Sequence, residues 1–146
     1  MTNKGSPYGI HRSLQPPGEF PQAAWKLDNR RELWSNEVLI EVEALNVDSA
    51  SFRQLSEQSA EEKKSIGELI EDIVRDRGKL HNPVTGSGGM LIGRVAALGP
   101  DVARRGDLTI GERIASMVSL SLTPLAIEEI LKVDEEIDRV TIRGHA

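Results

Sequence analysis

The sequence predicts a mainly β fold with a few helices: a small, partly open β-barrel with an inserted amphipathic helix at about residues 59–78. Three observations support this prediction. Residues 37–44 alternate between aliphatic and mostly acidic side chains, which is the period of a half-buried strand. Residues 59–78 repeat their apolar side chains with the spacing of a helix instead. Between residues 82 and 101, glycines interleave with an apolar run that is typical of a strand.

The composition is that of one globular domain, and it excludes several kinds of site. The chain has 146 residues, of which 38% are hydrophobic and 28% are charged. It has no cysteine, which excludes disulfides, thiolate metal sites and cysteine nucleophiles. Its three histidines, His11, His81 and His145, are far apart and lack the spacing of metal ligands. We therefore expect no metal site built on these side chains.

Charge and hydropathy argue against two classes of partner. A formal charge of −5 and only 3% aromatic residues disfavour nucleic acids, which bind basic surfaces with stacking side chains. No apolar run approaches the roughly 18 residues of a membrane span, and Met1 is not followed by the apolar segment of a signal peptide. We expect a cytoplasmic protein whose partners are neither nucleic acid nor membrane.

Residues 1–36 are expected to form an extended arm over the barrel. Four prolines stand among polar residues there and disfavour a long helix: Pro7, Pro16, Pro17 and Pro21. Trp25 and Trp34 are the expected anchors of the arm. For the side chains of Tyr8, His11 and Arg12, packing or exposure is favoured over a functional role.

Residues 37–44 are the clearest strand. One set of alternate side chains should point inward: Val38, Ile40, Val42 and Ala44. The other set consists of Glu37, Leu39, Glu41 and Glu43. Its glutamates are then a solvated face rather than a paired-carboxylate site. Asp48 and Ser49 follow the strand and suit a turn or the N-cap of a short helix. They would equally lie at the carboxyl end of the strand, where ligands often meet loops.

The helix predicted at residues 59–78 has start and stop signals. Ser59 and Glu62 have the spacing of a capping box, and Gly78 supplies a C-terminal stop. Its apolar stripe consists of Ile66, Leu69, Ile70, Ile73 and Val74. Gly67 within the helix costs about 1 kcal/mol relative to alanine, which burial of the stripe should offset.

Gly86, Gly88 and Gly89 precede the strand predicted from residue 90 onward, and each can adopt a positive φ or let a backbone or a ligand come close. A tight loop that enters a buried strand and a ligand-binding loop both fit this pattern. A Gly-Pro-Asp turn ends the strand. Further strands are expected at residues 113–118, 121–127 and 138–143, with Pro124 at an edge or bulge, whereas residues 128–132 are ambiguous.

Two sets of segments resemble known families. The first set is Glu37-Val-Leu-Ile-Glu-Val-Glu-Ala-Leu-Asn-Val-Asp48, Gly86-Ser-Gly-Gly-Met-Leu-Ile-Gly-Arg-Val95 with Leu98-Gly-Pro-Asp-Val102, and Leu108-Thr-Ile-Gly-Glu-Arg-Ile-Ala115. It is similar to the N-terminal catalytic domain of medium-chain dehydrogenases/reductases, a GroES-like barrel. The second set is Lys4-Gly-Ser-Pro-Tyr-Gly-Ile-His-Arg12, Leu45-Asn-Val-Asp-Ser-Ala-Ser-Phe52, Asn82-Pro-Val-Thr-Gly-Ser-Gly-Gly-Met90 and Val118-Ser-Leu-Ser-Leu-Thr-Pro-Leu125. It resembles the L-erythro-3,5-diaminohexanoate dehydrogenase family over almost the whole chain.

The narrower resemblance implies an NAD-dependent, zinc-independent oxidoreductase of lysine fermentation, which oxidatively deaminates 3,5-diaminohexanoate to 5-amino-3-oxohexanoate. Zinc-dependent relatives have a cysteine ligand where this chain has Asp48, and Gly-His-Glu where it has Gly88-Gly89-Met90. The proton-relay hydroxyl of those relatives falls on Ala50. The resemblance therefore implies amine chemistry, with Asp48 as the catalytic residue that holds the substrate ammonium, stabilises the developing iminium or acts as general base. A plain helix cap is the alternative role for Asp48.

The other candidate site residues would bind the substrate. Candidate hydrogen-bond partners are Ser49, Ser51, His81 and Ser87. Gly88 and Gly89 would leave room for an extended substrate. Arg53 or Arg12 would pair with its carboxylate.

NAD is expected to be bound mainly by a Rossmann domain, supplied in cis or in trans. Such a domain carries Gly-x-Gly-x-x-Gly between a strand and a helix, and Gly86-Ser-Gly-Gly-Met-Leu lacks the last glycine. We therefore expect residues 1–146 to be a single substrate domain that is inactive alone. The alternatives are a stand-alone barrel that acts as an assembly or binding module, and a fragment of a zinc-free quinone or enone reductase. Apolar surface meant for another domain would favour a homo-oligomer.

Overall fold

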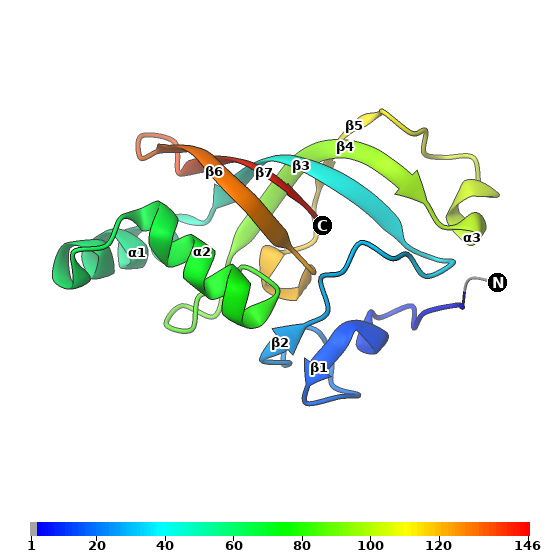
Figure 1. Ribbon diagram of the computed structural model, residues 1–146, viewed down its shortest axis with the longest axis horizontal. Helices are drawn as coiled ribbons and strands as arrows, with labels where there is room; N and C mark the ends of the chain where they lie inside the picture. Colours follow the sequence, from blue (N-terminus) through cyan, green and yellow to red (C-terminus); the bar gives the residue numbers. More distant parts are fainter. Residues whose placement is uncertain (1–2) are drawn as a thin grey trace.

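The computed structural model describes residues 3–146, which form a mainly β fold (Figure 1). The strands of this part of the chain are β1 (Ser13–Gln15), β2 (Lys26–Leu27), β3 (Val38–Val47), β4 (Gly89–Leu98), β5 (Arg113–Ser116), β6 (Ala126–Asp134) and β7 (Arg139–His145). Its helices are α1 (Ser49–Glu62), α2 (Ile66–Arg77) and α3 (Pro100–Ala103), with 3-10 turns η1 (Ile10–Arg12) and η2 (Leu120–Leu122). The predicted fold class, mainly β with a few helices, is confirmed.

Five strands form one antiparallel sheet in the order β5-β4-β3-β7-β6. Because β5 and β6 are its two outer strands, this sheet does not close into a barrel, which agrees with the partly open fold that the sequence predicts. The short strands β1 and β2 pair with each other in a second sheet within the N-terminal arm. The assignment to the GroES-like class stays a prediction.

The central strand, β3, follows the predicted alternation only as far as Val42. Its pairing with both neighbours changes register between Val42 and Ala44, and the buried side chains beyond this irregularity are Leu45 and Val47. The prediction that Ala44 points into the core is therefore wrong. An irregularity of this kind exchanges the two faces of a strand, because side chains alternate with a period of two.

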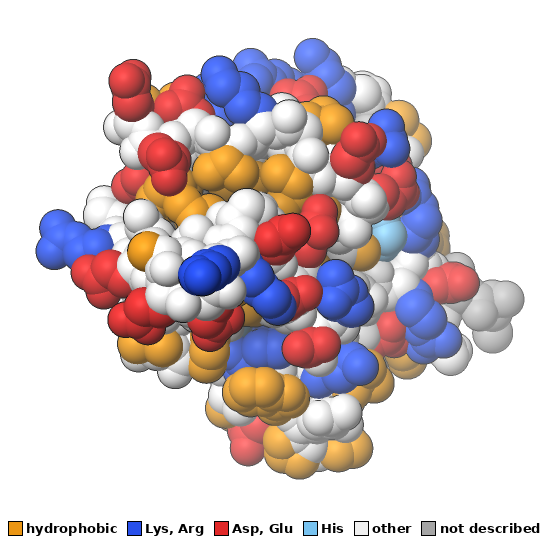
Figure 2. Space-filling view, turned by 60° about the vertical axis from the view of Figure 1, so that its left-hand side comes forward, with side chains coloured by type: hydrophobic (Ala, Val, Ile, Leu, Met, Phe, Trp, Pro, Cys, Tyr) orange, Lys and Arg blue, Asp and Glu red, His pale blue; other side chains and the backbone are white. Residues whose placement is uncertain are grey.

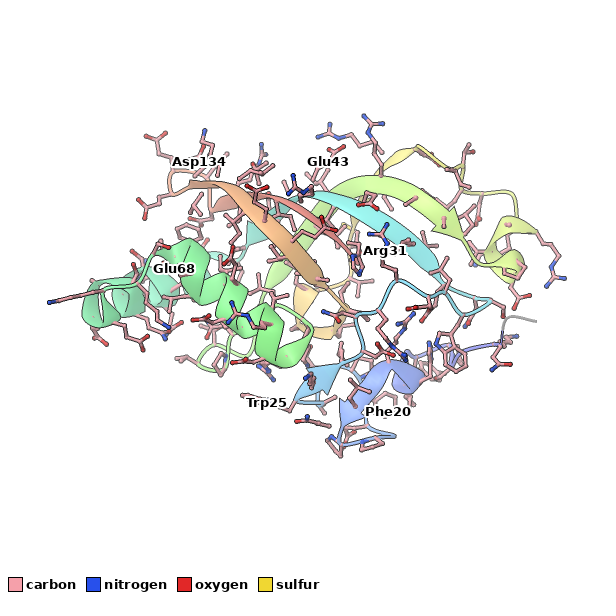
Figure 3. The ribbon with its side chains drawn as sticks, in the orientation of Figure 1. Phe20, Trp25, Arg31, Glu43, Glu68 and Asp134 are labelled. Carbon is pink, nitrogen blue, oxygen red and sulfur yellow. The ribbon has the colours of Figure 1, made fainter. Side chains whose placement is uncertain are left out.

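The glutamates expected on a solvated face have different surroundings. Glu43 points out of the sheet, and its carboxylate oxygens lie 3.1 Å from Nε of Arg94 and of Arg113 (Figure 3). Glu37, just before the strand, is half-buried, and its carboxylate accepts hydrogen bonds from Arg12 at 2.6 and 2.9 Å. The prediction of a solvated face therefore holds for Glu43 and is wrong for Glu37.

The single helix predicted at residues 59–78 is two helices. α1 ends at Glu62, Lys63 adopts a φ of 55°, and α2 begins after Ser65. Ser65 forms the capping box with the residue three positions later, Glu68, so the predicted capping box at Ser59 is wrong. Each of the two serines precedes a glutamate at the required spacing, and local sequence does not decide between them.

The core lies between the five-stranded sheet and the two long helices (Figure 1). Strands β3, β4 and β7 and both helices contribute side chains that are at most 1% exposed: Leu45, Leu91, Val140, Leu55 and Ile70. The apolar stripe predicted for α2 is thus confirmed. Gly78 ends this helix with a φ of 65°, as the sequence predicts.

The last part of the sheet begins later than predicted. Residues 121–127 were expected as a strand, but they contain most of η2 and a loop, and β6 starts only at Ala126. The serine before η2 favours the turn, because Oγ of Ser119 accepts a hydrogen bond from Ser121 N at 3.2 Å. The ambiguous residues 128–132 belong to β6, and the strands predicted near β5 and β7 are confirmed.

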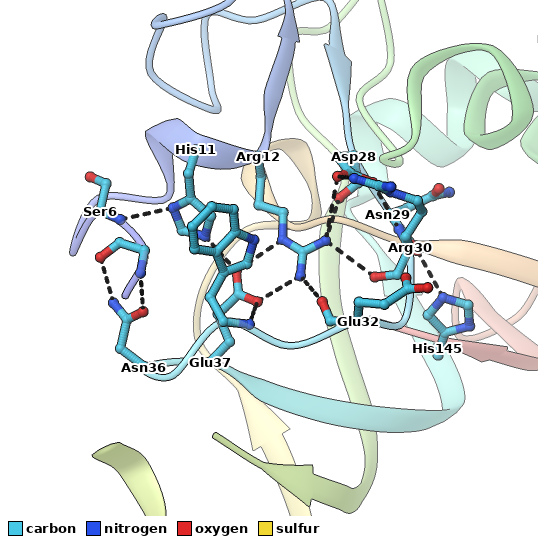
Figure 4. A network of polar contacts seen from close by, with 12 residues as sticks. Ser6, His11, Arg12, Asp28, Asn29, Arg30, Glu32, Asn36, Glu37 and His145 are labelled. Carbon is cyan, nitrogen blue, oxygen red and sulfur yellow. Dashed lines mark hydrogen bonds and ion pairs between the residues drawn. The ribbon is translucent and has the colours of Figure 1, made fainter. Parts of the chain in front are cut away.

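The N-terminal arm is extended, as predicted, and is fastened to the sheet by a polar network (Figure 4). Arg12, at the centre of the network, is only 6% exposed. Its guanidinium donates hydrogen bonds to the Glu37 carboxylate and to the backbone carbonyls of Asp28, Arg30 and Glu32. Arg12 is thereby committed to the fold, which leaves Arg53 as the candidate for a substrate carboxylate.

Both tryptophans anchor the arm. Trp34 packs against His11 with ring centroids 4.7 Å apart. Trp25 is 50% exposed, yet its ring carries the Arg77 guanidinium at 4.0 Å from the ring centroid, a cation–π contact. The prediction that these two residues hold the arm is confirmed.

The face on which α1 lies carries charges of both signs. Figure 2 shows Lys and Arg side chains interspersed with Asp and Glu side chains over this face, and hydrophobic side chains between them. On this face, charge is therefore mixed rather than concentrated in one sign.

None of the helices in residues 3–146 has the length and apolar character that crossing a membrane requires.

Candidate functional site

Asp48 lies where β3 ends and α1 begins, as the sequence predicts. It is the N-cap of α1, and its Oδ1 accepts a hydrogen bond from Ser51 N at 2.9 Å. Its own backbone N donates to the carbonyl of Gly88 at 3.2 Å. Asp48 is therefore both a helix cap and a neighbour of residues 82–89, which we call the glycine loop.

The second carboxylate oxygen of Asp48 is not used by the fold. Oδ2 is buried and has no hydrogen-bond partner among the described residues. Burial raises the pKa of Asp48, but the hydrogen bond from the Ser51 backbone N–H, with smaller effects of the Ser51 and Ser87 side chains, lowers it below its ordinary value. The result is an ionised carboxylate with one buried oxygen free to accept a hydrogen bond.

The glycine loop is fastened to α1 by two side-chain contacts. Thr85 Oγ1 lies 2.6 Å from Ser51 Oγ, and Asn82 Nδ2 donates to Gln54 Oε1 at 2.7 Å. Asn82 also closes the loop from within, because its Oδ1 accepts hydrogen bonds from the backbone of Val84 and Thr85. Sequence reasoning missed Asn82 and Thr85, although the Asn-Pro-Val-Thr sequence is a recognisable Asx-turn signal.

Gly88 and Gly89 allow neighbouring backbone segments of the chain to approach closely. A Cβ on Gly88 would lie 2.1 Å from the carbonyl oxygen of Leu80, and one on Gly89 would lie 2.0 Å from that of Asn46. Gly89 also has a φ of 127°, which strains any other residue. These contacts match the interpretation of a tight loop that enters a buried strand. Space for a substrate therefore lies elsewhere around the loop.

His81 stands just before the glycine loop as a half-buried, neutral imidazole. Burial, with the charges of Lys79 and Arg77, lowers the pKa of His81 to about 4. Its Nδ1 is buried and has no hydrogen-bond partner within the described chain. His81 thus offers a second unused polar atom in the same region as Asp48.

Ser49 and Arg53 lie on a different side of α1 from Ser51. Ser51 is buried against the glycine loop, whereas Ser49 and Arg53 are exposed. Both line an open recess of about 440 Å³ together with Phe52, Ser56, Glu57, Glu135 and Asp138. The structure therefore joins Asp48 to Ser51 and to the glycine loop, and it places the predicted arginine in a recess on another side of α1.

The site has neither of two common cofactor arrangements. Within residues 3–146, no three His, Cys, Asp or Glu residues are grouped so that they could hold a metal ion. The glycine loop leads directly into β4, whereas a dinucleotide phosphate site needs the N-terminus of a helix after its glycines. The residues present therefore do not fit NAD phosphates, and the zinc-free character of the site stays a prediction.

Comparison with known proteins places these residues in a defined group. Residues 11–146 match the family model described as the L-erythro-3,5-diaminohexanoate dehydrogenase N-terminal domain. Over 143 residues, 98% of this chain, the sequence is 52% identical to L-erythro-3,5-diaminohexanoate dehydrogenase of Fusobacterium nucleatum subsp. nucleatum, and it is equally similar to that of Acetoanaerobium sticklandii. The chain spans 41% and 42% of the lengths of these two relatives.

Proposed function

Because this chain belongs to the L-erythro-3,5-diaminohexanoate dehydrogenase family, as its N-terminal domain, we propose that it is the substrate-binding part of such an enzyme. The complete enzyme would oxidatively deaminate 3,5-diaminohexanoate to 5-amino-3-oxohexanoate, in lysine fermentation. The hydride acceptor would be NAD, bound by a Rossmann domain in cis or in trans, since the glycine loop does not fit it. The relatives are more than twice as long as this chain, which leaves room for that domain.

The observation that carries this proposal is the free oxygen of Asp48. A buried carboxylate oxygen without a partner is unfavourable, because burial removes its hydration. A substrate ammonium would supply both a hydrogen bond and the opposite charge. Such charge-assisted hydrogen bonds are among the stronger polar contacts in proteins. Asp48 therefore suits a cationic amine better than it suits a neutral carbonyl substrate.

The low pKa of Asp48 favours one of its candidate roles. A general base works best with a pKa near the working pH, and the polar contacts of Asp48 lower its pKa instead. A carboxylate that stays ionised can hold the ammonium until it loses one proton to water. The neutral amine would then give up hydride to NAD, and the carboxylate would stabilise the iminium that results. Water adds to that iminium carbon, and ammonia leaves to give the ketone. We therefore assign Asp48 an electrostatic role.

The other candidate site residues would act on the Asp48 carboxylate or bind other groups of the substrate. Ser51 and Ser87 hold the carboxylate in its ionised form. Arg53, from the neighbouring recess, would pair with the substrate carboxylate, and Ser49 would assist it. The neutral imidazole of His81 would offer its free Nδ1 as a hydrogen-bond partner.

The test is Asp48→Asn in the complete enzyme, whether one polypeptide or two. Asparagine is as good an N-cap as aspartate, so the fold should persist while the charge is removed. We expect kcat/KM for 3,5-diaminohexanoate with NAD to fall roughly 100- to 1000-fold. The midpoint of denaturant unfolding should change little.

Ser65→Ala is the matched control. It removes the cap of α2 and should cost about 1 kcal/mol of stability without changing kcat/KM. Unchanged kcat/KM in Asp48→Asn would remove Asp48 from the mechanism. Absence of turnover of this diamino acid by the wild-type enzyme would overturn the proposed substrate.

A further inference from the structure

The side chain of Gln22, in the N-terminal arm, joins two segments that are distant in sequence. Its Nε2 donates a hydrogen bond to the backbone carbonyl of Gly86 in the glycine loop at 3.3 Å. Its Oε1 accepts a hydrogen bond from Ser121 Oγ in η2 at 2.5 Å. Ser121 Oγ in turn lies 2.8 Å from Ser119 Oγ. One amide therefore ties the arm, the glycine loop and η2 together.

Two buried cations hold the arm in place beneath this amide. Lys79, which is fully buried, donates from Nζ to the carbonyls of Pro21 and Gln22 at 2.7 and 3.3 Å. Arg77 donates from Nε to the carbonyl of Trp25 at 2.9 Å and stacks on the ring of that residue. Within residues 3–146, neither cation forms an ion pair with a carboxylate. Residues 21–25 are therefore fixed at their backbone.

The contact at Gly86 attaches the glycine loop to the N-terminal arm. On the α1 side, Thr85 and Asn82 attach the loop to Ser51 and Gln54. Gly86 itself is exposed, and a Cβ built on it would have no atom within 4 Å. The loop has little packing at this point. The Gly86 backbone N donates to the Asn82 carbonyl within the loop at 2.8 Å, and the hydrogen bond from Gln22 is the contact that joins this point to the arm.

We propose that Gln22 is a positioning residue of the site: it holds the glycine loop beside Asp48 and Ser51, which the loop contacts through the Gly88 carbonyl and Thr85 Oγ1. This inference rests on the proposed function, because it assigns Gln22 an effect on turnover through the Asp48 carboxylate. An amide suits the position, since it donates to one partner and accepts from the other at the same time. Glutamate would keep the acceptor for Ser121 and lose the donor for Gly86. Methionine would lose both with little change in volume.

The experiment compares Gln22→Met and Gln22→Glu with wild type in the complete enzyme. The first measurement is amide hydrogen exchange of peptides that cover residues 82–89. We expect exchange there to rise roughly five- to tenfold in Gln22→Met, as for the loss of one hydrogen bond, and to stay unchanged in α2.

The second measurement is the pH profile of kcat/KM. We expect kcat/KM for the diamino acid to fall roughly 10- to 100-fold, with kcat affected more than KM. The acidic limb of the profile should move to higher pH, because Asp48 loses the hydroxyl of Ser87 that lowers its pKa. A residue that only stabilised the fold would not move this limb. Gln22→Glu should show the same changes, since it also lacks the donor.

Gln15→Met is the matched control. Gln15 lies in β1 of the same arm and its side chain is exposed, so its loss should change neither loop exchange nor kcat/KM. Unchanged loop exchange in Gln22→Met would overturn the inference, and so would raised exchange with an unchanged kcat/KM. If wild type does not turn over the diamino acid, the proposed function fails, and the exchange measurement still decides by itself whether Gln22 holds the loop.

Discussion

Two polar clusters of this molecule are built from the same kinds of side chain but differ in how completely their groups are paired. In the arm network around Arg12, the guanidinium faces the Glu37 carboxylate and three backbone carbonyls (Figure 4). Around the glycine loop, Asp48 and His81 each keep a buried polar atom that has no partner within residues 3–146. Among the described residues, the nearby Lys79 ammonium contacts only backbone carbonyls and no carboxylate.

This difference separates a structural cluster from a candidate binding site. A buried ion pair with all its hydrogen bonds made holds two segments in one arrangement, and removing one member leaves the other unpaired. A buried polar atom without a partner costs free energy, unless a ligand supplies the missing hydrogen bond. The arm network should therefore govern stability, and the surroundings of the glycine loop should govern binding.

The largest effect should come from breaking the paired cluster. Arg12→Met leaves the half-buried Glu37 carboxylate without its main partner and should lower the free energy of unfolding by about 3–5 kcal/mol. Denaturant unfolding measures this change. Arg31→Met is the matched control, because the exposed pair of Arg31 with Glu41 should contribute less than about 1 kcal/mol. Equal effects of the two variants would contradict the assignment of Arg12 to stability.

Lys79 should have a smaller effect on the free energy of unfolding, because no carboxylate within residues 3–146 pairs with its charge. Burial, with the charge of Arg77, lowers the pKa of Lys79 to about 8, so between pH 8 and 10.5 the unfolded chain binds more protons than the folded one. The stability of wild type should therefore rise over this window, by on the order of 2–3 kcal/mol relative to Lys79→Met. Unfolding midpoints at pH 8 and at pH 10 measure the difference. Parallel pH profiles of the two proteins would show that the charge is neutralised.

The smallest effect should come from His81, which is only half-buried. Its pKa is lowered to about 4, so the folded chain binds fewer protons than the unfolded chain between pH 4 and 6.5. Stability should therefore be fully present above pH 6.5 and fall as the pH drops towards 4, by about 1–2 kcal/mol relative to His81→Gln. Thermal unfolding at pH 7 and at pH 4.5 provides the comparison. An equal loss in both proteins would assign the acid sensitivity to other groups.

Local patterns predicted the parts of the fold that depend on neighbouring residues. The alternation of β3 as far as Val42, the stripe of α2 and the cap at Asp48 are all set within a few positions of the chain. The resemblance to the diaminohexanoate dehydrogenase family also rested on short segments, and the family match confirms it.

Patterns of this kind did not reveal partners that are far apart in sequence. Glu37 was expected on a solvated face because the strand alternation contains no information about Arg12, 25 residues earlier. No local sequence pattern indicated a role for Gln22, because its partners Gly86 and Ser121 lie 64 and 99 residues away. The start of α2 was missed for the opposite reason: two capping signals six residues apart are equally good locally.

The position of β3 at the centre of the sheet also sets when the domain can fold during synthesis. β3 pairs with β7, and Ile40 exchanges two backbone hydrogen bonds with Ala146. At a translation rate of roughly 5–20 residues per second, β3 waits about 5–20 s for that partner. Until then, one side of β3 is an open edge that can pair with another chain. A nascent chain of this domain should therefore be most prone to pairing with other chains until β7 has left the ribosome.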